Sequence, residues 1–146
     1  MNKFSQVALD VGSDQPVTGT NLTAISDLAC PVAPQDRCYF DFRILFQQSL
    51  LTASMKLDLA FPSSPTSIVY NITMPASSGT SDIMVNSVNR MCNGTALIAA
   101  TSDYLAQITG VLINGSNAGV LQPQFASTGL GTVTVRAGSS AIMTNL

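Results

Sequence analysis

The side chains that most often carry catalysis are scarce in this chain. It contains no histidine, which excludes Ser-His-Asp and Cys-His nucleophile systems, His-ligated zinc and the commonest general base. The acidic residues are all Asp and are scattered along the sequence. Asp41 and Asp58 each have a basic residue two positions away, Arg43 and Lys56, and we expect solvated cross-strand pairs on adjacent strands. The chain is predicted not to be an enzyme.

The remaining chemically suggestive residues also lack the context that a site needs. Gly129-Leu130-Gly131 is typical of a hairpin tip and not of a phosphate-binding loop, and Ser139-Ser140 has no base nearby to activate it. Cys30, Cys38 and Cys92 are odd in number and lack metal-ligand spacing. They are predicted to be three reduced thiols, with a Cys30–Cys38 disulfide as the alternative. We expect no metal, no cofactor and no small-molecule substrate.

Composition indicates a single domain that is covered by protein partners. Only 10% of the 146 residues are charged, against roughly 25% in an average soluble domain. A net charge of −2 without a basic run argues against nucleic acid, and no apolar stretch approaches the roughly 20 residues of a membrane helix. Much of the surface must therefore be uncharged, and charge-poor surfaces are typical of interface cores.

Alternation of apolar and polar residues predicts an antiparallel all-β domain. In the clearest run, 39–46, Phe40, Phe42, Ile44 and Phe46 share one face. Further strands are predicted over 55–61, 68–74, 104–113, 119–126, 132–136 and 141–144, and 81–92 is assigned to strand and loop. An Asn-Gly pair at 114–115 predicts a hairpin, and Pro123 requires an edge or a bulge. Roughly eight strands without a convincing helix indicate a β-sandwich or jelly roll.

The N-terminal segment is predicted to be an extended arm. Residues 1–16 carry a short apolar patch that ends in the turn-rich run Gly12-Ser13-Asp14-Gln15-Pro16. The arm would precede a jelly-roll domain over 17–146. The arm residues that could anchor the chain to a capsid or a neighbouring subunit are Phe4, Val7, Leu9 and Val11.

Several sequence motifs are similar to a known group of proteins. Residues 104–115 read YLAQITGVLING, 119–126 read GVLQPQFA, and 133–139 read VTVRAGS. In the first half, an early segment at 22–28 precedes the aromatic strand at 39–46. Over roughly 17–144 this pattern resembles virion proteins of tailed bacteriophages that carry a jelly-roll domain of the tumour-necrosis-factor (TNF)-like type. Pro123 departs from the pattern.

The resemblance implies a homotrimer made in the cytoplasm of a bacterial host. The first function that the resemblance implies is that of a capsid decoration (cement) protein, which binds the major capsid protein on the outer surface of the phage head. The alternatives are a tail- or fibre-associated receptor-binding module and a small tail adaptor. Outward-facing apolar residues at a three-fold axis would form the trimer interface, and the candidates are Tyr39, Leu45 and Leu105.

Overall fold

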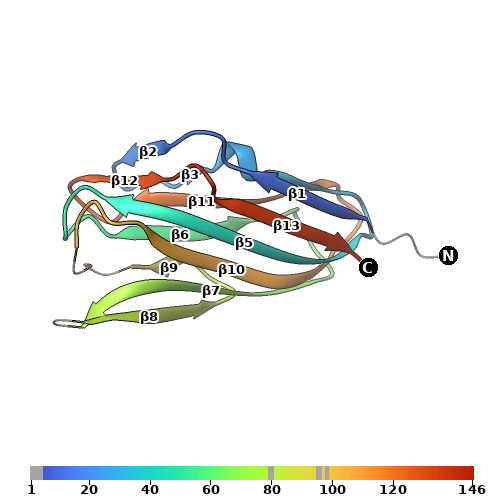
Figure 1. The fold of residues 1–146 in the computed structure, drawn as a ribbon. Helices are drawn as coiled ribbons and strands as arrows, with labels where there is room; N and C mark the ends of the chain where they lie inside the picture. Colours follow the sequence, from blue (N-terminus) through green and yellow to red (C-terminus); the bar gives the residue numbers. More distant parts are fainter. Residues whose placement is uncertain (1–4, 79–80, 95–96, 98) are drawn as a thin grey trace.

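The computed structural model consists of two antiparallel β-sheets that form a sandwich (Figure 1). It describes residues 5–78, 81–94, 97 and 99–146, and over 77–78 and 81–87 it describes the backbone alone. The larger, eight-stranded sheet contains β1 (Gln6–Asp10), β2 (Gln15–Thr18), β5 (Arg37–Gln48), β7 (Ser67–Ser78), β8 (Ser81–Val88), β10 (Tyr104–Ile113), β12 (Thr132–Val135) and β13 (Ser140–Asn145). The smaller, five-stranded sheet contains β3 (Thr23–Ala24), β4 (Cys30–Val32), β6 (Met55–Ala60), β9 (Cys92–Asn93) and β11 (Gly119–Ser127), and the 3-10 helix η1 (Ser26–Leu28) separates β3 from β4. The predicted all-β sandwich is confirmed.

The predicted inward-facing residues form one hydrophobic core between the sheets. The phenylalanines of β5 alternate with exposed or half-buried residues, as the period of two predicts. The largest buried side chains are Phe40, Phe42, Phe46, Phe125, Ile25, Leu28, Ile44, Met55, Leu57, Ile72, Met74 and Ile108. Each sheet contributes to this list, so neither sheet could bury its apolar side without the other.

Most connections carry the chain from one sheet to the other. The larger sheet has the order β1-β13-β5-β10-β7-β8, with β12 also beside β5 and β2 beside β12. The smaller sheet has the order β3-β11-β6-β9, with β4 also beside β11. From β5 to β12 only the β7–β8 connection joins strands of one sheet.

The hairpin predicted at Asn114-Gly115 is wrong, because β10 and β11 belong to different sheets. Asn114 is buried, and its side-chain amide donates to the backbone oxygens of Ala33 and Asn117, both at 2.8 Å. A Cβ atom on Gly115 would lie 2.4 Å from the Ser64 carbonyl oxygen. Asn114 and Gly115 therefore allow the chain to cross closely from one sheet to the other. Tight turns favour the same two residue types, which is why the pair resembled a hairpin signal.

The separate arm predicted over 1–16 is also corrected. Strand β1 pairs with β13, and the predicted boundary at residue 16 falls inside β2, which pairs with β12. Val11 is only 2% exposed, and Val7 and Leu9 pack against the core of their own domain. Pairing with β13 turns Val7 and Leu9 toward the core, and the Val11 N–H is bonded to the Ser139 oxygen at 2.8 Å. These residues therefore belong to the domain, and their role as an anchor stays a prediction. Phe4, the fourth arm residue, lies outside the described residues.

The edge formed by β1, β2, β12 and β13 is interrupted at one position. Residues 11–14 lie opposite residues 136–139, and the pairing register is the same on both sides of this break. Strand β5 has no matching insertion, because Val135 pairs with Phe46 and Ser140 already pairs with Arg43. The break is therefore a bulge relative to β5.

Pro123 lies within a paired strand, at a gap in the neighbouring strand. On one side β11 pairs with β6 through Pro123 and Leu59. On the other side, the pairing with β4 ends at Leu121 and the pairing with β3 begins at Gln124. The ring nitrogen of Pro123, which carries no hydrogen, therefore lies on the side of β11 where η1 interrupts the neighbouring strands. No ladder hydrogen bond from residue 123 is needed on that side.

Candidate functional site on the outer face of the eight-stranded sheet

An uncharged apolar groove lies at one end of the outer face of the eight-stranded sheet. The register of β5, β10 and β7 places Tyr39, Val111 and Val69 in one row across three strands. Val88, on the adjacent β8, pairs with Asn71. The four apolar side chains are 44–59% exposed. They border a groove of about 300 Å³, whose lining also includes Tyr70, Asn71, Thr109 and Gly110.

Gly110 sets how closely the strands beneath the groove approach. A Cβ atom here would lie 2.4 Å from the Val69 carbonyl oxygen, 2.6 Å from the Phe40 ring and 2.7 Å from the Tyr70 Cβ. Real side chains do not tolerate such contacts without movement of the backbone. The shape of the groove therefore depends on the absence of a side chain at residue 110.

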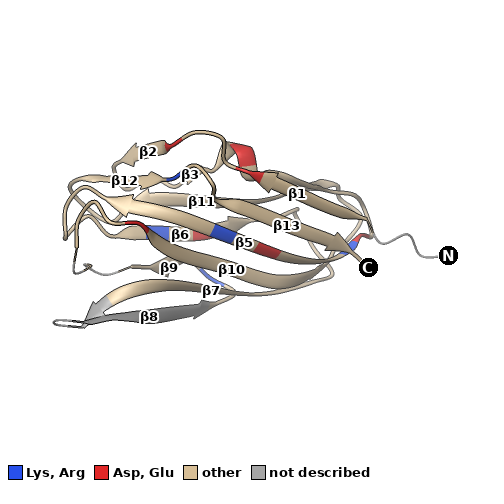
Figure 2. Ribbon diagram, in the orientation of Figure 1, with Lys and Arg blue, Asp and Glu red and all other residues tan. Residues whose placement is uncertain are grey.

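A compensated ion pair lies beside the groove, near the middle of the same face. The Arg43 guanidinium lies 3.3 Å from the Asp41 carboxylate, which also accepts a hydrogen bond of 3.0 Å from the Gln107 amide. Figure 2 shows these opposite charges as adjacent coloured segments of β5 on an otherwise mainly uncoloured sheet. The described part of this outer face therefore combines apolar residues with little net charge.

The three residues predicted at a trimer interface share this face but do not form one cluster. Tyr39 borders the groove. Leu45 and Leu105 pair with each other across β5 and β10, about 20 Å from Tyr39 at the usual rise of a strand. The sequence reasoning did not identify Val69 and Val111 as neighbours of Tyr39. Their alternation was visible in the sequence, but only the register shows that they form a row.

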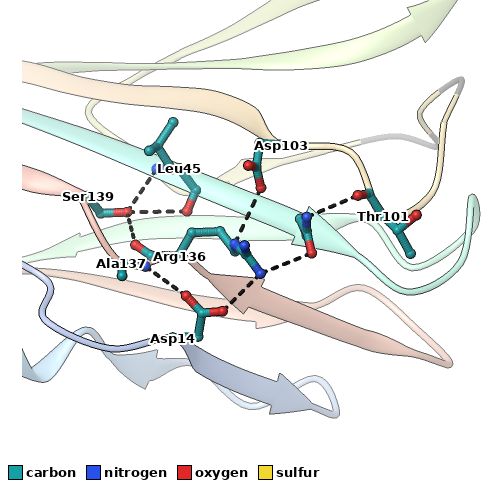
Figure 3. A network of polar contacts seen from close by, with 8 residues as sticks. Asp14, Leu45, Thr101, Asp103, Arg136, Ala137 and Ser139 are labelled. Atoms are coloured by element: carbon teal, nitrogen blue, oxygen red, sulfur yellow. Dashed lines mark hydrogen bonds and ion pairs between the residues drawn. The ribbon is translucent and has the colours of Figure 1, made fainter.

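A second polar cluster joins four segments at the break in the sheet edge (Figure 3). The Arg136 guanidinium lies 2.9 Å from the Asp14 carboxylate and 3.4 Å from that of Asp103. It also donates to the Gln47 side-chain oxygen at 3.3 Å. The Asp14 carboxylate in turn accepts from the Ala137 N–H at 2.9 Å. This arrangement binds these segments of the protein together.

Ser139 serves the same break and is fully buried. Its hydroxyl accepts a hydrogen bond from the Leu45 N–H at 2.9 Å and lies within bonding distance of the carbonyl oxygens of Leu45 and Arg136 (Figure 3). The side chain thus replaces the backbone partner that the bulge removes from β5. Its role is structural, because every neighbour in this set is backbone.

The three cysteines are free, as predicted, and all three are buried. Burial raises the pKa of both Cys30 and Cys38 to about 11, and it raises the pKa of Cys92 as well. Thiols react as thiolates, so the raised pKa makes these three residues less reactive than an exposed cysteine. Within the described ranges, no three His, Cys, Asp or Glu residues gather closely enough to hold a metal ion.

A search of the same described residues finds no helix that is long and apolar enough to cross a membrane. Comparison with known proteins found no matching family model, no matching curated protein and no matching solved structure.

Proposed function

We propose that this chain is a structural virion protein of a tailed bacteriophage. It acts as a homotrimeric capsid decoration (cement) protein that binds the major capsid protein on the outer surface of the head. The observation that carries the proposal is the apolar groove on the outer face of the eight-stranded sheet, beside which the charges of Asp41 and Arg43 compensate each other. Contiguous apolar surface on a small domain is typical of a protein interface, because water contact with it is unfavourable.

Copies of the same chain are suitable occupants of this face. Identical faces repel each other when they carry net charge, but here Asp41 and Arg43 compensate each other. The whole chain has a net charge of only −2. Depletion of charge and exposure of a tyrosine are both features of interface cores. Self-association would therefore cover apolar surface at little electrostatic cost.

The strand order supports a jelly roll of the TNF-like type. Between β5 and β12 the chain alternates between the sheets, except at the β7–β8 connection. Strands from both ends of the chain meet where β1 pairs with β13. Jelly rolls have this kind of connectivity and are common in viral coats. The fold is compatible with many functions, so it supports the proposal only together with the surface.

The aromatic residues favour an assembly role over recognition of a host glycan at a tail tip. A glycan site uses exposed aromatic rings as stacking platforms. Tyr70 is buried, and the Tyr104 hydroxyl is hydrogen-bonded to the backbone of Ala99 at 3.2 Å. Tyr39 and Phe61 are exposed, but Tyr39 lies in a row with Val111 and Val69. The amide of Asn71, in the same groove, already donates to the Thr73 hydroxyl at 3.0 Å.

The mass in solution tests self-association. We expect the wild-type chain to have three times the monomer mass of 15.2 kDa in sedimentation equilibrium. Val69→Asp should reduce the mass to that of a monomer, because it places a charge in the groove. Val120→Asp is the matched control, since Val120 is 41% exposed on the outer face of the other sheet. A wild-type monomer at micromolar concentration, or equal effects of both substitutions, would contradict the proposed trimer.

Binding to heads tests the cement role separately. The wild-type trimer should co-sediment with undecorated heads of the phage that encodes it. A trimer that does not bind these heads would rule out the cement role, and a tail location would then become the favoured reading.

A further inference from the structure

A second apolar surface lies at the opposite end of the sandwich from the groove. Three loops meet there, at 19–22, 49–54 and 128–131, and each exposes leucine. The exposed residues, here called the leucine tip, are Leu22, Leu50, Leu51 and Leu130. Leu130 is 86% exposed, the highest value among the large exposed hydrophobic residues. No charged residue occurs in any of the three loops.

Hydrogen bonds hold the loops of the leucine tip together. Ser49 and Thr132 exchange two bonds, in which the Ser49 N–H donates at 2.9 Å and the Thr132 N–H donates to the Ser49 hydroxyl at 2.8 Å. The Ser127 N–H donates to the Gly19 oxygen, and the Thr128 N–H donates to the Ser54 oxygen. The tip is therefore preformed, and a preformed surface loses less entropy when it binds.

We infer that the leucine tip of one copy occupies the groove of a second copy. This inference rests on the proposed self-association and specifies how the copies contact each other. The exposed leucines of the tip are apolar and uncharged, and the groove has a mainly apolar lining that includes no charged residue. A groove of about 300 Å³ is at the lower limit for small-molecule pockets. It suits an occupant of the size of one or two side chains.

The directions of the two surfaces allow the contact to close into a ring. Side chains that border the groove project roughly perpendicular to the sheet. The three loops that carry the leucine tip lie at the strand ends, beyond β2, β5 and β11 (Figure 1). A contact between two different surfaces is heterologous and forms either a ring or an open filament. A three-fold rotation about the body diagonal of three mutually perpendicular directions carries each direction onto the next, so it can carry the groove of one copy to face the tip of its neighbour. A closed trimer of identical contacts is therefore geometrically possible.

Area and charge favour a second copy over other occupants. From β13 to β8 the face is about 20 Å wide, and the groove occupies only one end of it. The groove alone therefore offers a contact area of a few hundred Å². A stable interface buries roughly 800 Å² on each partner. Adding the leucine tip gives each copy two contact surfaces. Attachment of the tip to an anionic membrane would require basic residues. The nearest one, Lys56, is bonded to the Thr20 oxygen at the margin of the tip.

A complementation experiment tests the inference. Leu130→Asp removes the tip and keeps the groove, and Val111→Asp removes the groove and keeps the tip. We expect each variant alone to be a monomer in sedimentation velocity. An equimolar mixture should form a heterodimer, because one tip and one groove remain intact between the two variants. Val111→Thr, which preserves the branched shape that strands favour, provides a second groove variant in case Val111→Asp does not fold.

The outcomes separate this inference from the proposed function. If Leu130→Asp stays trimeric while Val111→Asp dissociates, the sheet faces associate without the tip, and the inference fails while self-association stands. If both variants are monomers and their mixture is also monomeric, the tip does not enter the groove and the inference again fails. If neither substitution changes the wild-type mass, both the inference and the proposed interface are wrong.

Discussion

The two outer faces of the sandwich differ in a way that the inner faces do not. Both sheets bury apolar side chains on the inside. Outside, the strands of the eight-stranded sheet expose Tyr39, Val69, Val88, Leu105, Val111 and Ile142. The five-stranded sheet instead presents Lys56, Asp58, Gln122 and Gln124, and Val120 is the large exposed hydrophobic residue of its described strands.

This difference separates what holds the fold together from what indicates function. Inner alternation is shared by both sheets and is sufficient to form a core. An outer apolar residue adds nothing to that core. A cluster of such residues on one sheet only therefore requires an explanation outside the single chain.

The largest expected effect comes from filling the space beneath the groove. Gly110→Ala places a methyl group 2.4 Å from a backbone oxygen, whereas Gly119→Ala, in the other sheet, meets the Pro62 side chain at 2.9 Å. Overpacking against backbone requires strands to separate, so we expect Gly110→Ala to cost about 3 kcal/mol in the free energy of unfolding. Gly119→Ala should cost less, and urea unfolding measures both.

Gly12→Ala is the control for this comparison, because a Cβ atom at residue 12 meets nothing within 4 Å. Gly110→Ala should also weaken self-association, since β7 and β10 both border the groove. An unfolding free energy equal to that of Gly12→Ala would show that the strands adjust freely and that the groove is not rigid.

A smaller loss of stability is expected where the larger sheet is interrupted. Each sheet has one strand break opposite a continuous strand, at 136–139 in the larger sheet and at 25–29 in the smaller. The smaller sheet uses a backbone bond from Ile25 to Pro123 at its break, whereas the larger sheet uses the Ser139 hydroxyl. Ser139→Ala leaves the partly buried Leu45 N–H without that bond, which costs about 2 kcal/mol.

Urea unfolding also measures this effect, with Ser140→Ala as the neighbouring control on β13, where the side chain is half-buried. Because the break lies away from the groove, the mass of the assembled Ser139→Ala protein should match that of the wild type. Equal stability of the two variants would mean that another group, such as water, satisfies the Leu45 N–H.

The sequence predicted the core well and the connections poorly. Alternation in 39–46 identified Phe40 and Phe46 as buried because burial on one side of a strand imposes a period of two. The Asn-Gly pair at 114–115 was misassigned because small and amide residues permit both tight turns and close crossings between sheets. Asp41 and Asp58 were expected on adjacent strands, but β5 and β6 lie in different sheets. Pairing between strands depends on distant residues, which local patterns do not report.

The candidate site was predicted only in part, for a related physical reason. Tyr39 was recognised as outward-facing, yet its neighbours Val69 and Val111 are 30 and 72 positions away in the sequence and meet it only through the register of three strands. Val11 was predicted to belong to an arm. An apolar patch before a turn has the same composition whether it forms a free arm or pairs with a strand of the same domain. Here pairing with β13 decides the outcome.

The smallest expected effect concerns the charges of the two faces. Asp41→Asn keeps an acceptor for Gln107 but leaves the Arg43 charge uncompensated on the proposed interface. Copies should then repel each other, weakening association by about 1 kcal/mol, or roughly fivefold in the dissociation constant. Asp58→Asn changes the net charge by the same amount on the opposite face, where Asp58 accepts from the Leu59 N–H, and should leave association unchanged. Sedimentation at low salt measures both, and the difference should shrink near 1 M salt, where the screening length is about 3 Å. If the two variants associate equally at low salt, the eight-stranded face does not lie at the interface between copies, and the contrast between the faces would need a partner other than this chain.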